Sequence, residues 1–135
     1  MAKFSVSGLQ DLMLDLEQIA QLPDTVLDQM LVEAAEIVER KQKEVGKEYG
    51  VHRTGMTLAS IKRGSPKRGK DGKTIYIYPQ GMNADGNRNA EVAFVNEFGK
   101  RGQPARPFIR DANEQAADEI AAAMEKEYDD WLESR

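Results

Sequence analysis

Cysteine is absent from this 135-residue chain, and histidine and tryptophan occur only once each. Without cysteine the chain can form neither a disulfide framework nor a cysteine-based zinc site, and it has no thiol nucleophile. The single histidine, His52, excludes a metal site that needs two histidines. We therefore expect a cytosolic origin and a protein that is not an enzyme, with no metal ion and no cofactor.

Long hydrophobic runs are absent as well. No apolar stretch approaches the roughly 20 residues of a membrane-spanning helix, so no membrane contact is expected. The N-terminal stretch is interrupted by Asp11 and Asp15, which argues against a signal peptide. The glycine-containing segment 69–73, GKDGK, lacks the full phosphate-loop pattern, which argues against a nucleotide site.

Acidic residues are scarce in one region of the chain, and basic residues are scarce in the remainder. Residues 40–73 hold eleven Lys or Arg against three acids, a balance of +8, whereas the rest of the chain holds eight against twenty, a balance of -12. Such segregation fits a nucleic-acid contact, or copies of one subunit that meet head to tail, or merely solvated helix faces beside a mobile basic loop. The sequence leaves the three interpretations open.

The N-terminal third predicts helices over residues 8–49. Apolar residues from Leu9 to Ala20 recur at the spacing of one helix face, and Pro23 ends that first segment. Asp24 then caps a longer segment in which Leu27 and later apolar residues keep the same period. We expect both helices to pack on the core.

The middle, residues 53–99, predicts a small sheet. Residues 74–78, TIYIY, form the clearest strand, and residues 58–64 are its simplest hairpin partner. Between them, residues 65–72 contain no apolar side chain, which predicts an exposed, mobile loop. Residues 92–98 fit either a strand or a helical turn, and we favour the strand.

The last part, residues 104–133, predicts a stiff proline arm followed by a long helix. Pro104 and Pro107 fix φ in PARP, and Phe108 opens an apolar pattern of about seven turns. One domain of α+β class is therefore expected over residues 1–135, with a small antiparallel sheet packed against long N-terminal and C-terminal helices.

Two sequence blocks carry a resemblance to a known family. NEFG at 96–99 followed by PARPFIRDA at 104–112 resembles the signature of the small head-tail joining, or tail-completion, proteins of long-tailed bacteriophages. The upstream segment Arg53-Thr54-Gly55 is similar to a second block of that family, and the resemblance extends from about Leu27 to the end. Asp111 departs from the pattern, where proline is more common.

This resemblance implies a structural virion protein of the head-tail junction, or neck, made in the bacterial cytoplasm. It implies a homo-oligomeric ring that contacts the head connector and the tail proteins, with DNA passing through the lumen without specific binding. The assembly candidates come from the two blocks and from the basic loop: Arg53, Thr54, Gly55, Lys67, Arg68, Lys70, Glu97, Phe98, Gly99, Pro104, Arg106, Pro107 and Phe108.

Glu97 and Arg106 are charged residues beside aromatic ones, and a charge in such a setting is usually paired. They can pair with each other inside one subunit, or Arg106 can reach an acid on a neighbouring subunit. A different function is also open: a small nucleic-acid-binding module that uses the basic loop at 62–73, with tyrosines as stacking platforms. Its residues would be Arg63, Lys67, Arg68, Lys70, Lys73 and Tyr76 or Tyr78.

Overall fold

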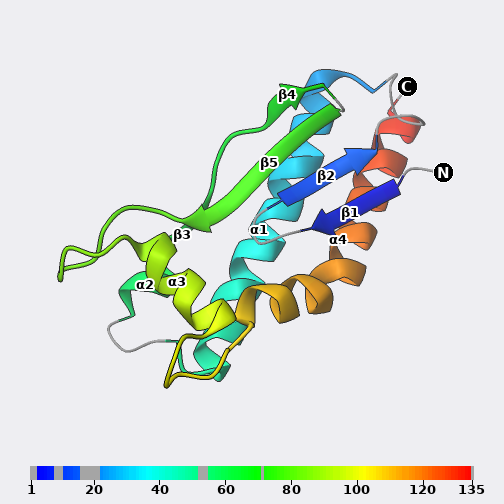
Figure 1. Ribbon diagram of the computed structural model, residues 1–135. Coiled ribbons are helices and arrows are strands. Elements are labelled where there is room, and N and C mark those ends of the chain that lie inside the picture. The colour runs from blue at the N-terminus through cyan, green and yellow to red at the C-terminus, as the bar shows by residue number, and fades with distance from the viewer. Residues whose placement is uncertain (1–2, 8–10, 16–21, 52–54, 71, 135) are drawn as a thin grey trace.

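A computed structural model describes residues 3–7, 11–15, 22–51, 55–70 and 72–134, with side chains described from residue 22 onward. The α+β class is confirmed: long helices near both ends of the chain pack together against one antiparallel sheet (Figure 1). The helices are α1 Asp24–Glu48, α2 Met56–Ala59, α3 Asn89–Phe98 and α4 Phe108–Glu133. The strands are β1 Lys3–Ser7, β2 Asp11–Asp15, β3 Ile61–Arg63, β4 Lys67–Gly69 and β5 Gly72–Pro79.

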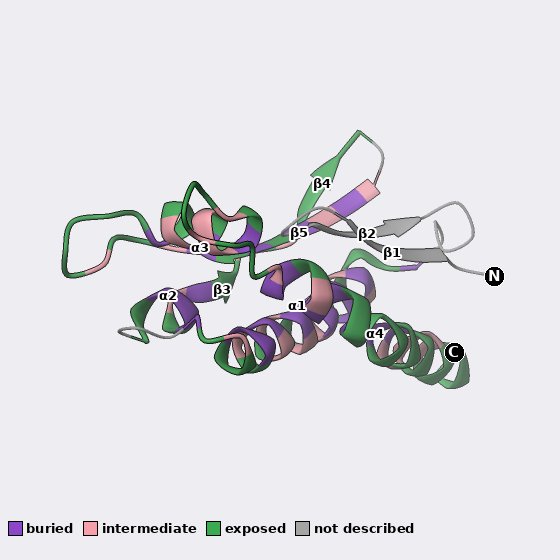
Figure 2. Ribbon diagram, turned by 60° about the horizontal axis from the view of Figure 1, so that its bottom comes forward, coloured by how far each residue is buried: buried purple, intermediate pink, exposed green. Residues whose placement is uncertain are grey.

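β5 is the central strand of the sheet, whose order is β1-β2-β5-β3, and β4 also pairs with β5. Its residues alternate with period two: Ile75 and Ile77 are buried, whereas Tyr76 and Tyr78 are exposed. α1 packs on the buried face, and α4 packs along α1 and against β1. Figure 2 shows α1 and α4 together on one side of the strands, so the face with the two tyrosines is left open.

The core is a continuous cluster of apolar side chains from α1, α4, β3 and β5. One buried polar pair lies within it: Gln42 Nε2 of α1 donates to Asn113 Oδ1 of α4 at 3.0 Å. Because a buried polar group is costly without its partner, this pair favours one register of the two helices over others.

The predicted helix before Pro23 is wrong where the structure describes it. Residues 11–15 form β2, which pairs with both β1 and β5. A short apolar run fits both the helical and the strand period, and pairing with the edge of β5 favours the strand. The alternation of Phe4 and Val6 with serines was the signal of a strand. The helix after Pro23 is confirmed as α1, and residues 16–21 lie outside the described part.

The expected hairpin is confirmed by β3, which pairs antiparallel with residues 77–79 of β5. The segment 65–72, predicted as a loop, instead contains the short strand β4, whose Lys67 pairs in register with Thr74. All three residues of β4 are exposed, as predicted. Backbone pairing to β5 therefore holds residues 67–69, which have no apolar anchor of their own. The mobility of the segment 65–72 stays a prediction.

The favoured strand at residues 92–98 is wrong, because the segment belongs to the helix α3. Its buried residues Asn89, Ala93 and Glu97 are four apart and so lie on one helix face. The C-terminal helix is confirmed as α4, which begins at Phe108 directly after the arm.

Candidate functional site

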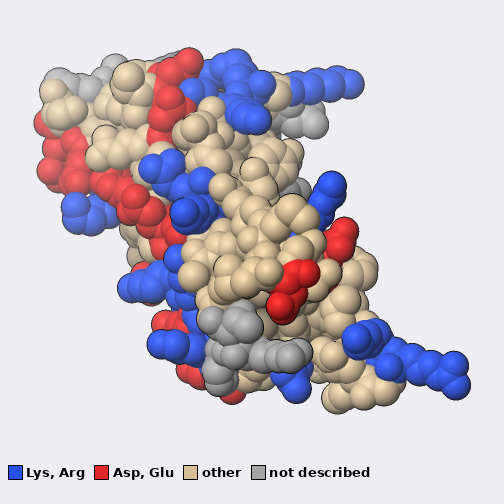
Figure 3. Space-filling view, turned by 90° about the vertical axis from the view of Figure 1, so that its left-hand side faces the viewer, with Lys and Arg blue, Asp and Glu red and all other residues tan. Residues whose placement is uncertain are grey.

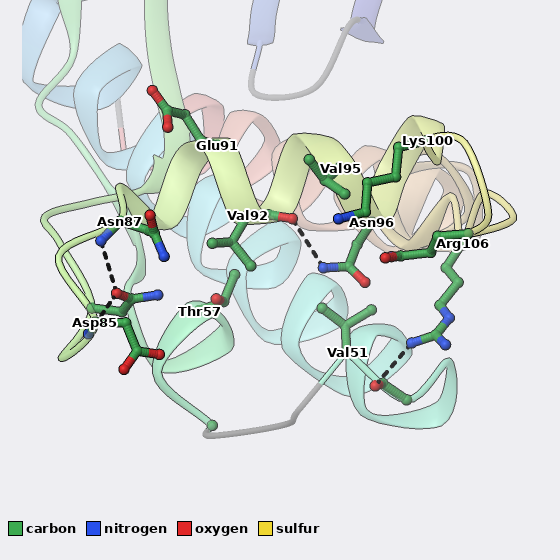
Figure 4. A pocket seen from close by; sticks show the side chains of 14 residues that line it. Val51, Thr57, Asp85, Asn87, Glu91, Val92, Val95, Asn96, Lys100 and Arg106 are labelled. Carbon is green, nitrogen blue, oxygen red and sulfur yellow. Dashed lines mark hydrogen bonds between the residues drawn. The ribbon is translucent and has the colours of Figure 1, made fainter.

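A groove of about 540 Å³ lies beside α3 (Figure 4). Val92, Val95 and Asn96 of α3 form one side, and Val51 and Thr57 lie opposite them. The groove ends carry different groups: Lys100 and Arg106 at one end, Asp85 and Asn87 at the other. It therefore offers a middle lined by valines together with Thr57 and Asn96, between a cationic end and an end with a carboxylate and an amide.

The asparagines order the groove walls. Asn83 Oδ1 accepts hydrogen bonds from the backbone N–H groups of Asp85 and Asn87, both at 3.0 Å, which is a side-chain-capped turn. Asn96 Nδ2 donates to the carbonyl of Val92 at 2.9 Å. None of these asparagines was predicted as a site residue, although three asparagines lie within residues 83–89.

Glu97 is a buried residue, 3% exposed, that caps α4. Its carboxylate accepts the backbone N–H of Ile109 at 2.8 Å and that of Arg110 at 3.2 Å. These two donors belong to the first helical turn, where no partner exists within the helix, and Pro107 at the N-cap offers no side-chain acceptor. A negative charge at the N-terminus of a helix also interacts favourably with the helix dipole.

Of the two alternatives for Glu97 and Arg106, the pair within one subunit is not formed, because each residue has a different partner. Arg106 has an exposed side chain, and its Nη1 donates to the carbonyl of Gly50 at 3.3 Å. Its backbone N–H donates to the carbonyl of Asn96 at 2.6 Å. The arm thus fixes the backbone of Arg106, while its guanidinium is in no ion pair among the described residues.

A tight double turn connects α3 to α4. Gly99 has φ 77° and ψ 177°, and a Cβ there would lie 2.8 Å from Ala105 N and from Gln103 O. Pro107, at φ -76° and ψ 64°, is the centre of an inverse γ-turn in which Phe108 N–H donates to the carbonyl of Arg106 at 2.7 Å. Glycine and proline in this block are explained by backbone geometry.

The remaining candidates of this block separate into buried and exposed residues. Phe108 is fully buried in the core, whereas Phe98 is 57% exposed and packs against Phe94 with ring centroids 4.7 Å apart and ring planes tilted by 49°. Pro104 is exposed on the arm. Gly55 lines the groove, while its neighbours Arg53 and Thr54 lie outside the described residues.

The basic candidates lie away from the groove, on and next to β4. Lys67, Arg68 and Lys70 are exposed, and Arg68 pairs with Asp24 of α1. Lys73 is only 6% exposed and forms ion pairs with α1 acids. The structure thus brings Gly55 of the upstream block and Asn96 and Arg106 of the downstream block to one groove, and it leaves the basic segment separate from them.

Asp111, which departs from the family pattern, has a structural partner. The Tyr49 hydroxyl donates to its Oδ2 at 2.5 Å, and this bond lowers the pKa of Asp111 below its ordinary 3.8 and raises that of Tyr49 above 10.0. Arg110 also bonds Asp111 at 3.2 Å. The contact ties the end of α1 to the first turn of α4.

The described residues contain no group of three or more potential metal ligands from His, Cys, Asp and Glu. No helix within the described ranges is long and apolar enough to cross a membrane. No protein-family model matches the chain, and no curated protein and no solved structure matches it either.

Proposed function

We propose that this protein is a structural component of a bacteriophage virion at the head-tail junction, where it completes the tail or joins it to the head. It acts by assembly: copies close a ring through head-to-tail contacts, and the two ring faces dock the head connector and the tail proteins. DNA passes through the lumen without specific binding. No catalytic step is part of the proposal.

One observation carries the proposal. Gly55 of the upstream block and Arg106 of the downstream block line the same groove although they lie far apart in sequence. Residues from both blocks thus contribute to one surface, where a guanidinium with no ion-pair partner in the described chain is held on a stiff backbone. Such a group suits recognition of a carboxylate on another subunit.

The test is Arg106→Ala, measured in two assays. We expect a change in the free energy of unfolding within about 0.5 kcal/mol, as for most surface substitutions, together with loss of joining when the variant is added to tail-deficient phage lysates. Arg88→Ala is the matched control, since Arg88 is another exposed arginine, at the start of α3. Full joining by Arg106→Ala would contradict the proposed role of the groove.

A nucleic-acid-binding module is a second candidate, favoured by one feature of the open sheet face. Tyr78 is 42% exposed on β5, and Lys62 of β3 is its direct cross-strand partner. An exposed aromatic ring beside a cation is a stacking platform for a base. The ion pairs of Arg68 and Lys73 with α1 acids weigh against it, because they already neutralise part of the basic segment.

Salt dependence separates the two candidates. A single-strand binder loses affinity with a slope of about -0.7 in log K per log salt for each phosphate contact, whereas the assembly function predicts hardly any binding at physiological salt. Affinity that falls with salt and is lost in Tyr78→Ala would favour the binding module.

A further inference from the structure

Phe94 and Phe98 form an aromatic patch on the solvent side of α3. They are 56% and 57% exposed. The chain as a whole is hydrophilic, with a mean hydropathy of -0.63, so two exposed phenylalanines side by side stand out. Because they are four residues apart on one helix, their rings pack against each other at a tilt of 49° and present one continuous apolar surface. Phenylalanine is a costly residue to leave in water, so such a pair marks a contact surface.

Cations flank this patch. Lys100 and Arg101, two and three residues after Phe98, are exposed and have no ion-pair partner among the described side chains. Figure 3 shows a broad area of mostly uncharged side chains on one side of the molecule, interrupted by acidic groups, with basic side chains projecting at its upper and lower ends. The complementary surface would be acidic with small or apolar residues between the charges.

The chain itself carries such a surface on the outer side of α4. Ala117, Ala121, Ala122 and Leu132 are exposed there between acidic residues. The exposed acids without an ion pair in the described part of the chain are Glu114, Asp118, Glu125, Asp129 and Glu133. Alanines on a helix allow a partner to approach closely, and the acids would meet the cations.

The patch and the C-terminal half of the acidic face cannot meet within one chain. Figures 1 and 2 place α3 and the C-terminal half of α4 at opposite ends of the molecule, and the inner side of α4 is already packed on α1. Their complementarity is therefore available only between copies. A contact between two different surfaces of one chain is heterologous, and it builds a ring where the rotation between subunits closes and an open filament where it does not.

We propose that the Phe94–Phe98 patch with Lys100 and Arg101 of one subunit docks on the outer acidic face of α4 of a second copy. This inference rests on the proposed assembly function and names the surfaces that build the ring. Burial of the two rings would supply most of the affinity, while the charges select the orientation of the subunits and exclude patch-to-patch pairing.

A mixing experiment tests the contact, using two variants whose changes lie on exposed positions. The patch variant carries Phe94→Gln and Phe98→Gln, and the face variant carries Asp118→Lys and Glu125→Lys. Native mass spectrometry should find the wild type as one closed oligomer and each variant as a 15.1 kDa monomer. A one-to-one mixture retains one intact interface per pair and should stop at a dimer of both variants.

Two further measurements complete the test. Lys100→Glu with Arg101→Glu should abolish the oligomer, and adding the two face changes to the same chain should restore it. Melting temperatures like that of the wild type exclude misfolding as the cause. A monomeric wild type, a mixture that stays monomeric, or an oligomer that the patch variant abolishes while the face variant keeps it would overturn the inference.

The outcome is separable from that of the proposed function. If the mixture forms dimers but the wild type fails to join heads and tails in lysates, the contact stands and the phage function fails. If the wild type joins heads and tails but the charge exchange restores nothing, the function stands and this interface is wrong.

Discussion

Glu97 is the residue on which the connection between α3 and α4 depends. Removing its carboxylate leaves two first-turn N–H groups of α4 without an acceptor inside the protein. We expect Glu97→Ala to lower the free energy of unfolding by about 2 kcal/mol, as for loss of a helix cap, and Glu97→Gln by about half as much. Urea unfolding measures both, with the exposed Glu125→Ala as the control. An unchanged midpoint for Glu97→Ala would contradict the capping role.

Glu33 provides a pH-dependent prediction. Burial, followed by its contact with Glu127, raises the pKa of this α1 carboxyl above 4.5. A raised folded-state pKa means that the folded protein holds the proton longer than the unfolded chain, so stability falls as pH rises through this range. Glu33→Gln should therefore raise the melting temperature at about pH 7 and raise it less at about pH 4. An equal effect at both pH values would refute this assignment.

At the scale of elements, the turn after α3 yields a matched pair of substitutions. Gly99 and Gly102 both have positive φ, at 77° and 84°, but only a Cβ at Gly99 meets backbone atoms. Gly102→Ala should cost about 1 to 2 kcal/mol for the left-handed conformation alone, and Gly99→Ala should cost more, because rigid backbone cannot move away. Equal losses in thermal unfolding would show that the turn opens to accept the methyl group.

The helices with long apolar periods were predictable from the sequence, and the short elements were not. α1 and α4 repeat their pattern over many turns, so the period is unambiguous. β2 and α3 are runs of 5 and 10 residues in which both periods fit, and contacts with β5 and the core decided between them. β4 had no apolar signal at all, because backbone pairing with β5 and the ion pair of Arg68 with Asp24 hold it in place.

The candidate site was predictable in its residues but not in their roles. The sequence indicated that Glu97 and Arg106 are charged residues that need a partner. Their partners are backbone groups, N–H groups for Glu97 and a carbonyl for Arg106, and such partners leave no mark in a sequence of side chains. The groove likewise depends on asparagines whose hydrogen bonds become visible only in three dimensions.

At the scale of the whole molecule, the main feature is that two surfaces differ in their exposed side chains. α3 and the arm present aromatic and cationic side chains, whereas the outer side of α4 presents acids. The excess of positive charge in residues 40–73 contributes less to this difference between the ends than the sequence suggests. Part of that excess is neutralised, because Arg68 and Lys73 pair with acids of α1 and Arg40 pairs with an acid of α4. A subunit with unlike ends favours contacts that close into a ring.

Electron microscopy of the purified protein at high concentration tests this central claim most directly. The account predicts closed rings with one subunit number and a central opening, and their disappearance in Phe94→Gln with Phe98→Gln. Particles that stay monomeric at every concentration, or that form twofold dimers without an opening, would contradict it.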